Sequence, residues 1–182
     1  MRNSIFNFAG FQLGWFACVL GAANGMPWLG PVLAVPILGW HLSQASAPAI
    51  ELKLILTTAV VGSLFDQSLL SLGWIQYPQG SWPVWLLPLW MTTLWALFSS
   101  TLNVSLRWMR GRTALAIVFG AIGGPLAYLA GEKLGAMQLV AQPHALLALA
   151  SGWAMAMFWL LRFAGHHDGY AKKDFDEGRQ HV

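Results

Sequence analysis

Residues 113–135 read TALAIVFGAIGGPLAYLAGEKLG, and the first nineteen of these positions carry no charged side chain. A helix needs about 20 mainly apolar residues to cross the hydrocarbon core of a bilayer, so this stretch is long enough to span one. The whole chain has the same character, with 57% hydrophobic residues, 9% charged residues and a mean hydropathy of +0.55. Soluble domains usually carry about 25% charged residues, so the sequence predicts an integral membrane protein.

Five other apolar stretches accompany this one and form a single domain over residues 1–165. One of them is short and holds Pro31 and Pro36, so a kinked or partly re-entrant helix is an alternative there. The sequence therefore predicts an all-α fold, a compact bundle of six transmembrane helices, followed by a polar and disordered cytoplasmic tail at 166–182. The predicted spans are residues 4–22, 27–42, 51–73, 82–106, 113–135 and 143–164.

The placement of lysine and arginine predicts the orientation. With the amino terminus in the cytoplasm, nine of the ten basic residues lie on the cytoplasmic side, and Lys133, beside Glu132, lies outside. This positive-inside asymmetry predicts a bacterial inner-membrane protein with both termini in the cytoplasm. Because the basic residues stand at the ends of apolar runs, no nucleic-acid partner is expected. The nine are Arg2, Lys53, Arg107, Arg110, Arg112, Arg162, Lys172, Lys173 and Arg179.

Asp66 is the clearest ionisable residue inside a predicted span. Such a side chain costs about 2.5–3.5 kcal/mol at mid-span, so it is a natural place to look for function. Counting from Glu51 at the inner surface, Asp66 lies 15 residues along the helix, roughly 22 Å, in the outer half of the membrane. Two interpretations are open: a polar pocket or proton-linked carboxylate, and a buried structural carboxylate that joins its helix to its neighbours.

Tyr128 in the fifth span lies at a similar depth, so we expect a hydrogen bond between Tyr128 and Asp66. Glu132 continues the stripe of Tyr128 at four-residue spacing. Gln12, in the middle of the first span, is expected to bond between helices, and Asn24 to cap or line the outer end. The predicted polar cluster contains Asp66, Gln67, Tyr128, Glu132, Gln12 and Asn24.

Glycines in the fifth span predict close helix packing. Gly120 and Gly124 form a GxxxG pair, Gly131 and Gly135 repeat the spacing, and small residues let two helix backbones approach. Pro125 follows Gly124 and is expected to kink the helix and free a carbonyl group there.

The fourth span ends in a polar stripe at four-residue spacing, formed by Ser99, Asn103 and Arg107, with Arg110 and Arg112 close behind. This cluster predicts contact with a lipid head group or phosphate. The alternative is that the positive charge does no more than hold this loop in the cytoplasm.

No motif indicates a cofactor or a metal. The sequence has no P-loop, no Rossmann glycine pattern, no GxSxG elbow and no HExxH or CxxCH motif. His166, His167 and Asp168 lie together, but adjacent histidines on a polar tail are poorly arranged as ligands. His41 stands at the end of a predicted span, where a half-exposed histidine is ordinary. We therefore expect no cofactor and no metal.

Three stretches together resemble a known family. They are FQLGWFAC at 11–18, PLWM at 88–91 running on to SSTL at 99–102, and the glycine-rich fifth span with Tyr128. The chain resembles, over nearly its whole length, a family of small proteobacterial inner-membrane proteins known as domain of unknown function 2878. Members of that family are often encoded beside enzymes that modify membrane fatty acids.

The resemblance therefore implies an accessory role in membrane-lipid modification or envelope homeostasis, with membrane lipid and a lipid-modifying enzyme as partners. Catalysis by the chain itself is not expected. One alternative is a small transporter or permease subunit with Asp66 as the coupling carboxylate. Another is an integral-membrane enzyme that uses Asp66, Tyr128 or Glu132 as acid or base. The sequence does not indicate an oligomeric state.

Overall fold

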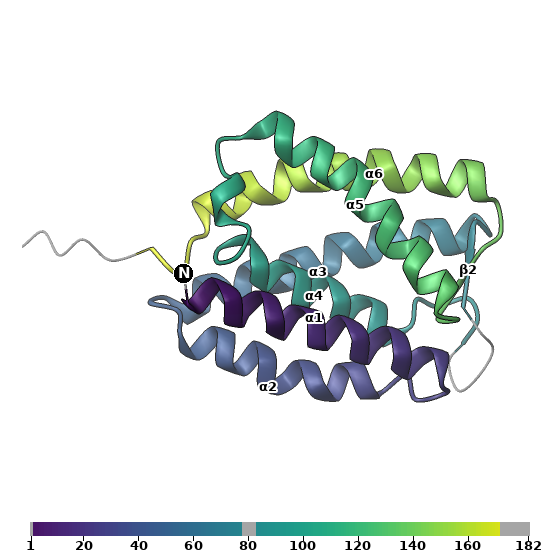
Figure 1. The fold of residues 1–182 in the computed structure, drawn as a ribbon, viewed down its shortest axis with the longest axis horizontal. Coiled ribbons are helices and arrows are strands. Elements are labelled where there is room, and N and C mark those ends of the chain that lie inside the picture. The colour runs from purple at the N-terminus through teal and green to yellow at the C-terminus, as the bar shows by residue number, and fades with distance from the viewer. Residues whose placement is uncertain (1, 78–82, 172–182) are drawn as a thin grey trace, which may run out of the picture.

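A computed structural model describes residues 2–77 and 83–171. Within these residues the chain forms six α-helices, one short 3-10 turn and one pair of two-residue strands (Figure 1). The predicted all-α class is confirmed. The helices are α1 (Arg2–Ala23), α2 (Leu29–Ser43), α3 (Pro48–Ser71), α4 (Leu89–Leu102), α5 (Thr113–Lys133) and α6 (Gln142–His166), and the 3-10 turn is η1 (Arg107–Met109).

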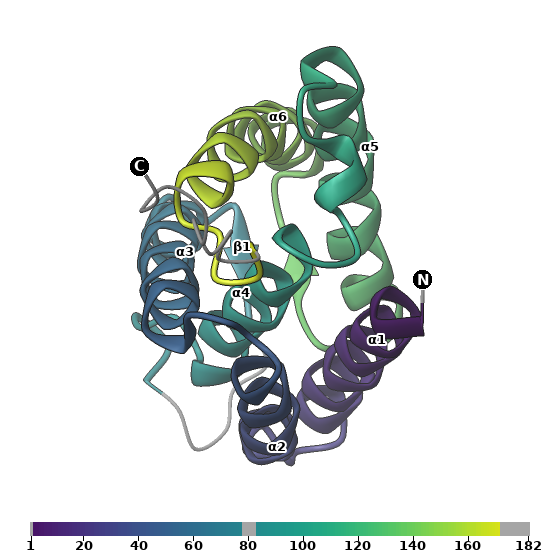
Figure 2. The ribbon, with the colours of Figure 1, turned by 90° about the vertical axis from the view of Figure 1, so that its left-hand side faces the viewer.

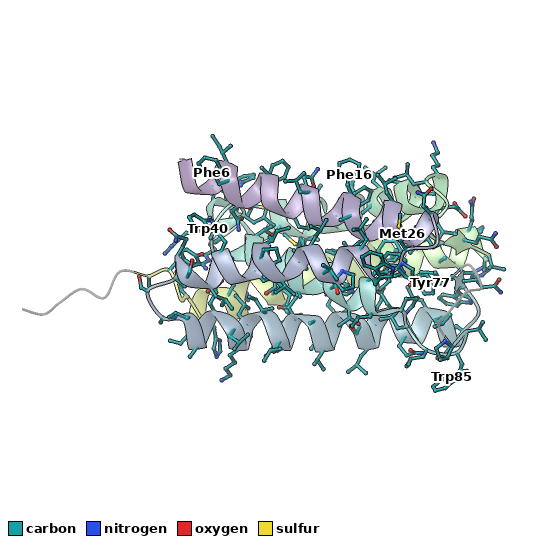
Figure 3. All side chains as sticks on the ribbon, turned by 90° about the horizontal axis from the view of Figure 1, so that it is seen from below. Phe6, Phe16, Met26, Trp40, Tyr77 and Trp85 are labelled. Carbon is teal, nitrogen blue, oxygen red and sulfur yellow. The ribbon has the colours of Figure 1, made fainter. Side chains whose placement is uncertain are left out.

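Of the helices described, α1, α3, α5 and α6 are long and apolar enough to cross a membrane. Large apolar side chains cover the outside of the bundle, and Leu13, Val35 and Leu147 are 69%, 70% and 71% exposed. A water-soluble monomer rarely exposes apolar surface on this scale, so hydrocarbon is the solvent for these faces. Side chains project all along the helices in Figure 3, with Trp40 near one end and Trp85 near the other. The chain is a membrane protein.

The helices form two groups around a central α4. In Figure 2, α5 and α6 lie on one side and α1 and α2 on the other, with α3 and α4 between them. α4 packs against α1, α2 and α3 and is mostly buried. α5 packs along α6 but approaches α1 and α4 sparsely. This separation leaves room between α5 and the rest of the bundle.

α4 is shorter than the predicted span at 82–106. It covers Leu89–Leu102, 14 residues or roughly 21 Å, which is less than the hydrocarbon thickness. The reason lies at its start, where Pro88 is extended (ψ 143°) and a proline cannot donate a helical hydrogen bond. At the other end the chain leaves the helix at Asn103. α4 is surrounded by other helices, so the bilayer does not require it to span alone.

Gln67 of α3 satisfies the non-helical backbone that precedes α4. Its side-chain amide donates to the carbonyl oxygen of Trp85 at 3.0 Å, and its carbonyl accepts from the backbone N–H of Leu87 at 2.8 Å. Irregular backbone at membrane depth needs such partners, because lipid supplies none. Gln67 was expected in the cluster around Asp66. Instead it holds the backbone of Trp85 and Leu87 ahead of α4, and we call this pair of hydrogen bonds the Gln67 clamp.

The loop after α3 and the loop after α5 are joined by two short strands, β1 (Ile75–Gln76) and β2 (Gln138–Leu139). They are antiparallel, with Ile75 opposite Leu139. Since α1 begins at the opposite end of the bundle, these strands close the end away from the amino terminus (Figure 1).

The predicted start of a solvated tail at His166 is wrong. α6 continues to His166, and residues 167–171 turn back against the bundle because buried polar groups hold them there. Residues 172–182 lie outside the described residues, and with them Lys172, Lys173 and Arg179, on which the predicted orientation partly rests. The start of the predicted fourth span, Trp82, is also outside them.

Gln67→Leu removes both bonds to the segment before α4. We expect it to lower the free energy of unfolding by about 0.5–1.5 kcal/mol for each bond, the net contribution of a typical intramolecular hydrogen bond. Unfolding in mixed detergent micelles, followed by circular dichroism, measures the change. Gln44→Leu is the control. Gln44 is exposed just after α2, and its bonds to backbone carbonyl groups come from its backbone N–H, which the substitution keeps. Equal stability of the two variants would contradict the clamp.

Candidate functional site

The carboxylate of Asp66 is the centre of the buried polar structure. Asp66 is fully buried. Its Oδ1 accepts a hydrogen bond from the hydroxyl of Tyr128, and its Oδ2 accepts one from the indole N–H of Trp95 at 2.7 Å. The predicted bond to Tyr128 is confirmed, whereas Trp95 was not predicted. The two bonds join α3 to α5 and to α4 and compensate for the cost of burying the carboxylate.

Two glycines let large rings reach this position. A Cβ atom at Gly62, one turn before Asp66, would lie 2.0 Å from the ring of Trp95. Trp95 stacks on Trp153 of α6 with ring centroids 4.5 Å apart, and a Cβ atom at Gly124 would lie 2.2 Å from Trp153. The two stacked rings are therefore held between a glycine of α3 and a glycine of α5.

The other glycines of α5 behave differently from one another. A Cβ atom at Gly120 would lie 2.3 Å from the carbonyl oxygen of Trp153, so Gly120 and Gly124 do form the close contact with α6. Gly131 has no such close contact with α6, although it lines a cavity together with Gly120 and Gly124, and Gly135 lies in the turn after α5 with φ +86°, where a side chain would be strained. α5 runs as one helix through Pro125.

Two residues of the predicted cluster lie away from Asp66. Glu132 accepts from the backbone N–H of Leu139 at 2.7 Å and from Gln142 at 3.2 Å, so it fastens β2 to α5. Asn24 is exposed and donates to the carbonyl oxygen of Leu20 at 2.8 Å, so it caps α1. Neither contributes to the Asp66 site.

Tyr77, in the loop after β1, is a neighbour of Asp66 that the sequence did not reveal. Its hydroxyl is buried and makes no hydrogen bond within the described part of the chain. Burial, and then the negative charge of Asp66, raise the pKa of Tyr77 well above its ordinary value. Tyr77 therefore stays neutral beside the carboxylate.

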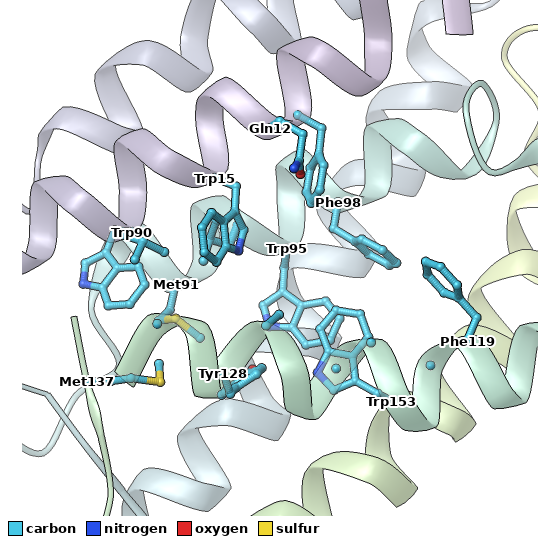
Figure 4. A pocket seen from close by; sticks show the side chains of 18 residues that line it. Gln12, Trp15, Trp90, Met91, Trp95, Phe98, Phe119, Tyr128, Met137 and Trp153 are labelled. Atoms are coloured by element: carbon cyan, nitrogen blue, oxygen red, sulfur yellow. The ribbon is translucent and has the colours of Figure 1, made fainter. Parts of the chain in front are cut away.

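A cavity of about 280 Å³ lies between α5 and the pair α1 and α4. Figure 4 shows Gln12 and Trp15 of α1 on one side and Tyr128 and Trp153 on the other. Apart from Gln12 and the edge of Tyr128, its walls are aromatic, aliphatic or glycine. Its volume is near the lower end of the range for ligand pockets, about 300–1,000 Å³.

The cavity faces the surface where α1 and α5 stand apart. Phe119, in its wall, is 45% exposed, and Gly123 is half-buried. The amide of Gln12 finds no hydrogen-bond partner among residues 2–77 and 83–171, so the expected bond between helices is absent there. Asp66 itself does not line the cavity, and the rings of Tyr128 and Trp95 separate it from the space.

A second buried acid lies at the end of the bundle where α1 begins. Glu51 of α3 is fully buried and bonds to His41 Nε2 at 3.0 Å, Asn103 Nδ2 at 2.7 Å and the backbone N–H of Gly169 at 3.1 Å. His41 was expected to be half-exposed, but it is 4% exposed because it packs on this carboxylate. Sequence spacing gave no signal for the cluster, since its members come from four separate segments.

The segment after α6 completes this second cluster. The hydroxyl of Tyr170 donates to the backbone carbonyl of His41. Asp168 accepts from Arg107 and from Arg110, both at 2.7 Å. Burial, and then the charge of Glu51, raise the pKa of Tyr170. Segment 167–171 is thus fastened to α2, α3 and the turn after α4.

The predicted stripe of Ser99, Asn103 and Arg107 is not a surface. Ser99 is fully buried and donates to Thr58 at 3.2 Å, and Asn103 bonds to Glu51. Because α4 ends at Leu102, the four-residue spacing no longer aligns Arg107 with them. Arg112 lies over the ring of Trp108 at 5.7 Å. A head-group role for the arginines stays a prediction.

Residues 4–159 match a family described as Protein of unknown function (DUF2878). The chain belongs to this family. The resemblance seen in the sequence is therefore confirmed, and the chain is a membrane protein of a family of unknown function. No curated protein and no solved structure matches it. The family match ends within α6, before the segment that contacts Glu51.

Asp66→Ala leaves two buried donors without an acceptor. We expect the free energy of unfolding to fall by about 1–3 kcal/mol for each donor, and Tyr128→Phe to cost less than Asp66→Ala. Unfolding in mixed micelles gives the values. Tyr77→Phe is the matched control, because its hydroxyl makes no hydrogen bond among the residues described. A loss in Tyr77→Phe as large as in Tyr128→Phe would refute the assignment.

Gly169→Ala tests how tightly the segment after α6 is held. A Cβ atom there would lie 2.8 Å from Glu51 Oε2 and 2.9 Å from the carbonyl oxygen of Ala47, so we expect segment 167–171 to detach. Hydrogen exchange of its amides should then become faster. Gly165→Ala is the control, since a Cβ atom there meets nothing within 4 Å. Unchanged exchange in Gly169→Ala would show that the segment tolerates the methyl group.

Proposed function

We propose that this membrane protein handles lipid: it accepts a hydrocarbon chain in the cavity between α1 and α5 and serves as an accessory to an enzyme that modifies membrane fatty acids. In this proposal the protein lies in a bacterial inner membrane with its arginine-rich turn, around η1, in the cytoplasm. The observation that carries the proposal is the apolar cavity of about 280 Å³ bordered by two helices that stand apart.

The chemistry of the walls favours an acyl chain as the occupant. Aromatic and aliphatic walls gain dispersion contacts when a flexible hydrocarbon chain fills the cavity. An empty cavity leaves its walls without these contacts. Gln12 adds one amide without a protein partner in the described ranges, which suits an ester or hydroxyl oxygen on such a chain. Lipid is also the molecule that surrounds this face at the highest concentration.

The transporter and enzyme alternatives have less support. Both need an ion or substrate to reach Asp66 or another acid within hydrogen-bond distance. Both oxygens of Asp66 are already occupied, and the side chain is fully buried. Glu132 is held by β2 and Gln142. A structural carboxylate and a lipid-facing cavity account for these contacts together.

Gly123→Leu fills the cavity with little disturbance. A Cβ atom at Gly123 lies 3.9 Å from its nearest neighbour, Phe119, so the added side chain enters open space. We expect labelling of the protein by a diazirine fatty acid in vesicles to fall several-fold. Gly39→Leu is the control, because it makes the same change on α2 where a Cβ atom meets nothing within 4 Å. Undiminished labelling of a folded Gly123→Leu protein would contradict the proposal that the cavity binds an acyl chain.

The cellular part of the proposal is tested with the same two variants. A deletion strain should change its membrane acyl-chain composition, and the wild type and Gly39→Leu should restore it while Gly123→Leu should not. An unchanged acyl profile in the deletion strain would reject the role in lipid modification, even if chain binding held.

A further inference from the structure

A separate pocket of about 210 Å³ lies between the start of α5 and the end of α6. Arg110, Arg162, His166 and Thr113 provide its polar lining, whereas Met157, Phe158 and Leu161 of α6 provide apolar lining. The start of α5 and the end of α6, which border this pocket, lie at the end of the bundle where α1 begins (Figure 1). It shares no lining residue with the cavity between α1 and α5.

Among residues 2–77 and 83–171, the positive charge around this pocket exceeds the negative charge. Asp168 is shared by Arg107 and Arg110, so one carboxylate serves two guanidinium groups. Arg162 and Arg112 make no ion pair with any described residue. The guanidinium of Arg162 lies 4.6 Å from the ring of Phe158, and its N–H groups make no hydrogen bond to a side chain or ion pair among the described residues.

The guanidinium of Arg110 is anchored at the pocket by hydrogen bonds to described residues. Its terminal nitrogens donate to Asp168 at 2.7 Å, to the carbonyl oxygen of Ala164 at 3.2 Å and to the side chain of Asn103. Its Nε is buried and has no hydrogen-bond partner in the described chain. A guanidinium anchored beside a pocket is pre-organised for an anion, and its planar shape matches phosphate as it matches carboxylate.

The surroundings indicate that the anion carries apolar chains. Trp108 is 53% exposed beside Arg112, as tryptophan is at the interface between head groups and hydrocarbon. The apolar lining continues from Met109 and Ala116 into α6. A free inorganic anion gains nothing from these walls, whereas a phospholipid meets them with its glycerol and upper acyl carbons.

We propose that the pocket between α5 and α6 binds the phosphate head group of an anionic phospholipid, with Arg162 and Arg110 as its cationic ligands and His166 at its edge. This site goes beyond the proposed function, because it requires no chain in the cavity between α1 and α5 and uses different residues. It gives the protein a preference for anionic over zwitterionic lipid at this end of the bundle.

Native mass spectrometry of the full chain, released from micelles that contain equal amounts of phosphatidylglycerol and phosphatidylcholine, tests the site. The wild type should retain phosphatidylglycerol preferentially. Arg162→Gln should lower this preference about fivefold, the usual effect of one basic residue near anionic lipid, and Arg162→Lys should keep most of it. Gly165→Leu keeps every charge but fills the pocket, since a Cβ atom there has open space, and should also lower retention.

Arg112→Gln is the matched control, because it removes an equally unpaired charge that does not line the pocket. An equal loss in Arg112→Gln and Arg162→Gln would overturn the site in favour of general surface charge. Displacement of the lipid by millimolar inorganic phosphate or glycerol phosphate would overturn the lipid as the ligand. Gly123→Leu should leave phosphatidylglycerol retention unchanged, so failure of this site and failure of the acyl-chain cavity give different results.

Discussion

The fold depends on one constraint: a carboxylate inside hydrocarbon must be fully hydrogen-bonded. Asp66 meets it with Trp95 and Tyr128, one from α4 and one from α5. α5 has little backbone contact with α1 or α4, so the bond from Tyr128 is a specific tie between the pair α5 and α6 and the rest of the bundle. Tyr128 also lines the cavity, so this tie lies at the cavity wall. The same residue therefore joins α5 to α3 and forms part of the cavity wall.

α3 carries a second acid that obeys the same rule at another depth. Glu51 and Asp66 are 15 residues apart on one helix, roughly 22 Å. Each is fully buried, and each collects donors from segments distant in sequence. Asp66 joins helices in the interior, whereas Glu51 joins α2 to α4 and the segment after α6. α3 thus carries both buried acids, and the polar contacts of an otherwise apolar bundle are arranged around them.

Sequence reasoning identified what depends on composition and local spacing: the membrane class, the six helices, the contact at Gly120 and Gly124, and the bond from Tyr128 to Asp66. It did not identify partners brought together by the tertiary fold. In the sequence, Trp95 looks like any other apolar aromatic residue. Only the fold shows that Gly62, which lacks a side chain, leaves room for its ring beside Asp66. Glu51 and His41 lie at helix ends, where exposure is the ordinary expectation, and it is segment 167–171 that covers them.

The small residues of α5 show why a packing motif alone does not distinguish contact from cavity. Residues with little or no side chain recur along α5. They border both the cavity between α1 and α5 and the pocket between α5 and α6. Where α6 presents a large residue, the two helices are in close contact: a Cβ atom at Gly120 would lie 2.7 Å from Met157 Cγ, although Gly120 also borders the cavity. Where no large residue is opposite, as at Gly123, α5 leaves space. The size of the side chain opposite each small residue therefore decides how closely α6 packs on α5 at that position.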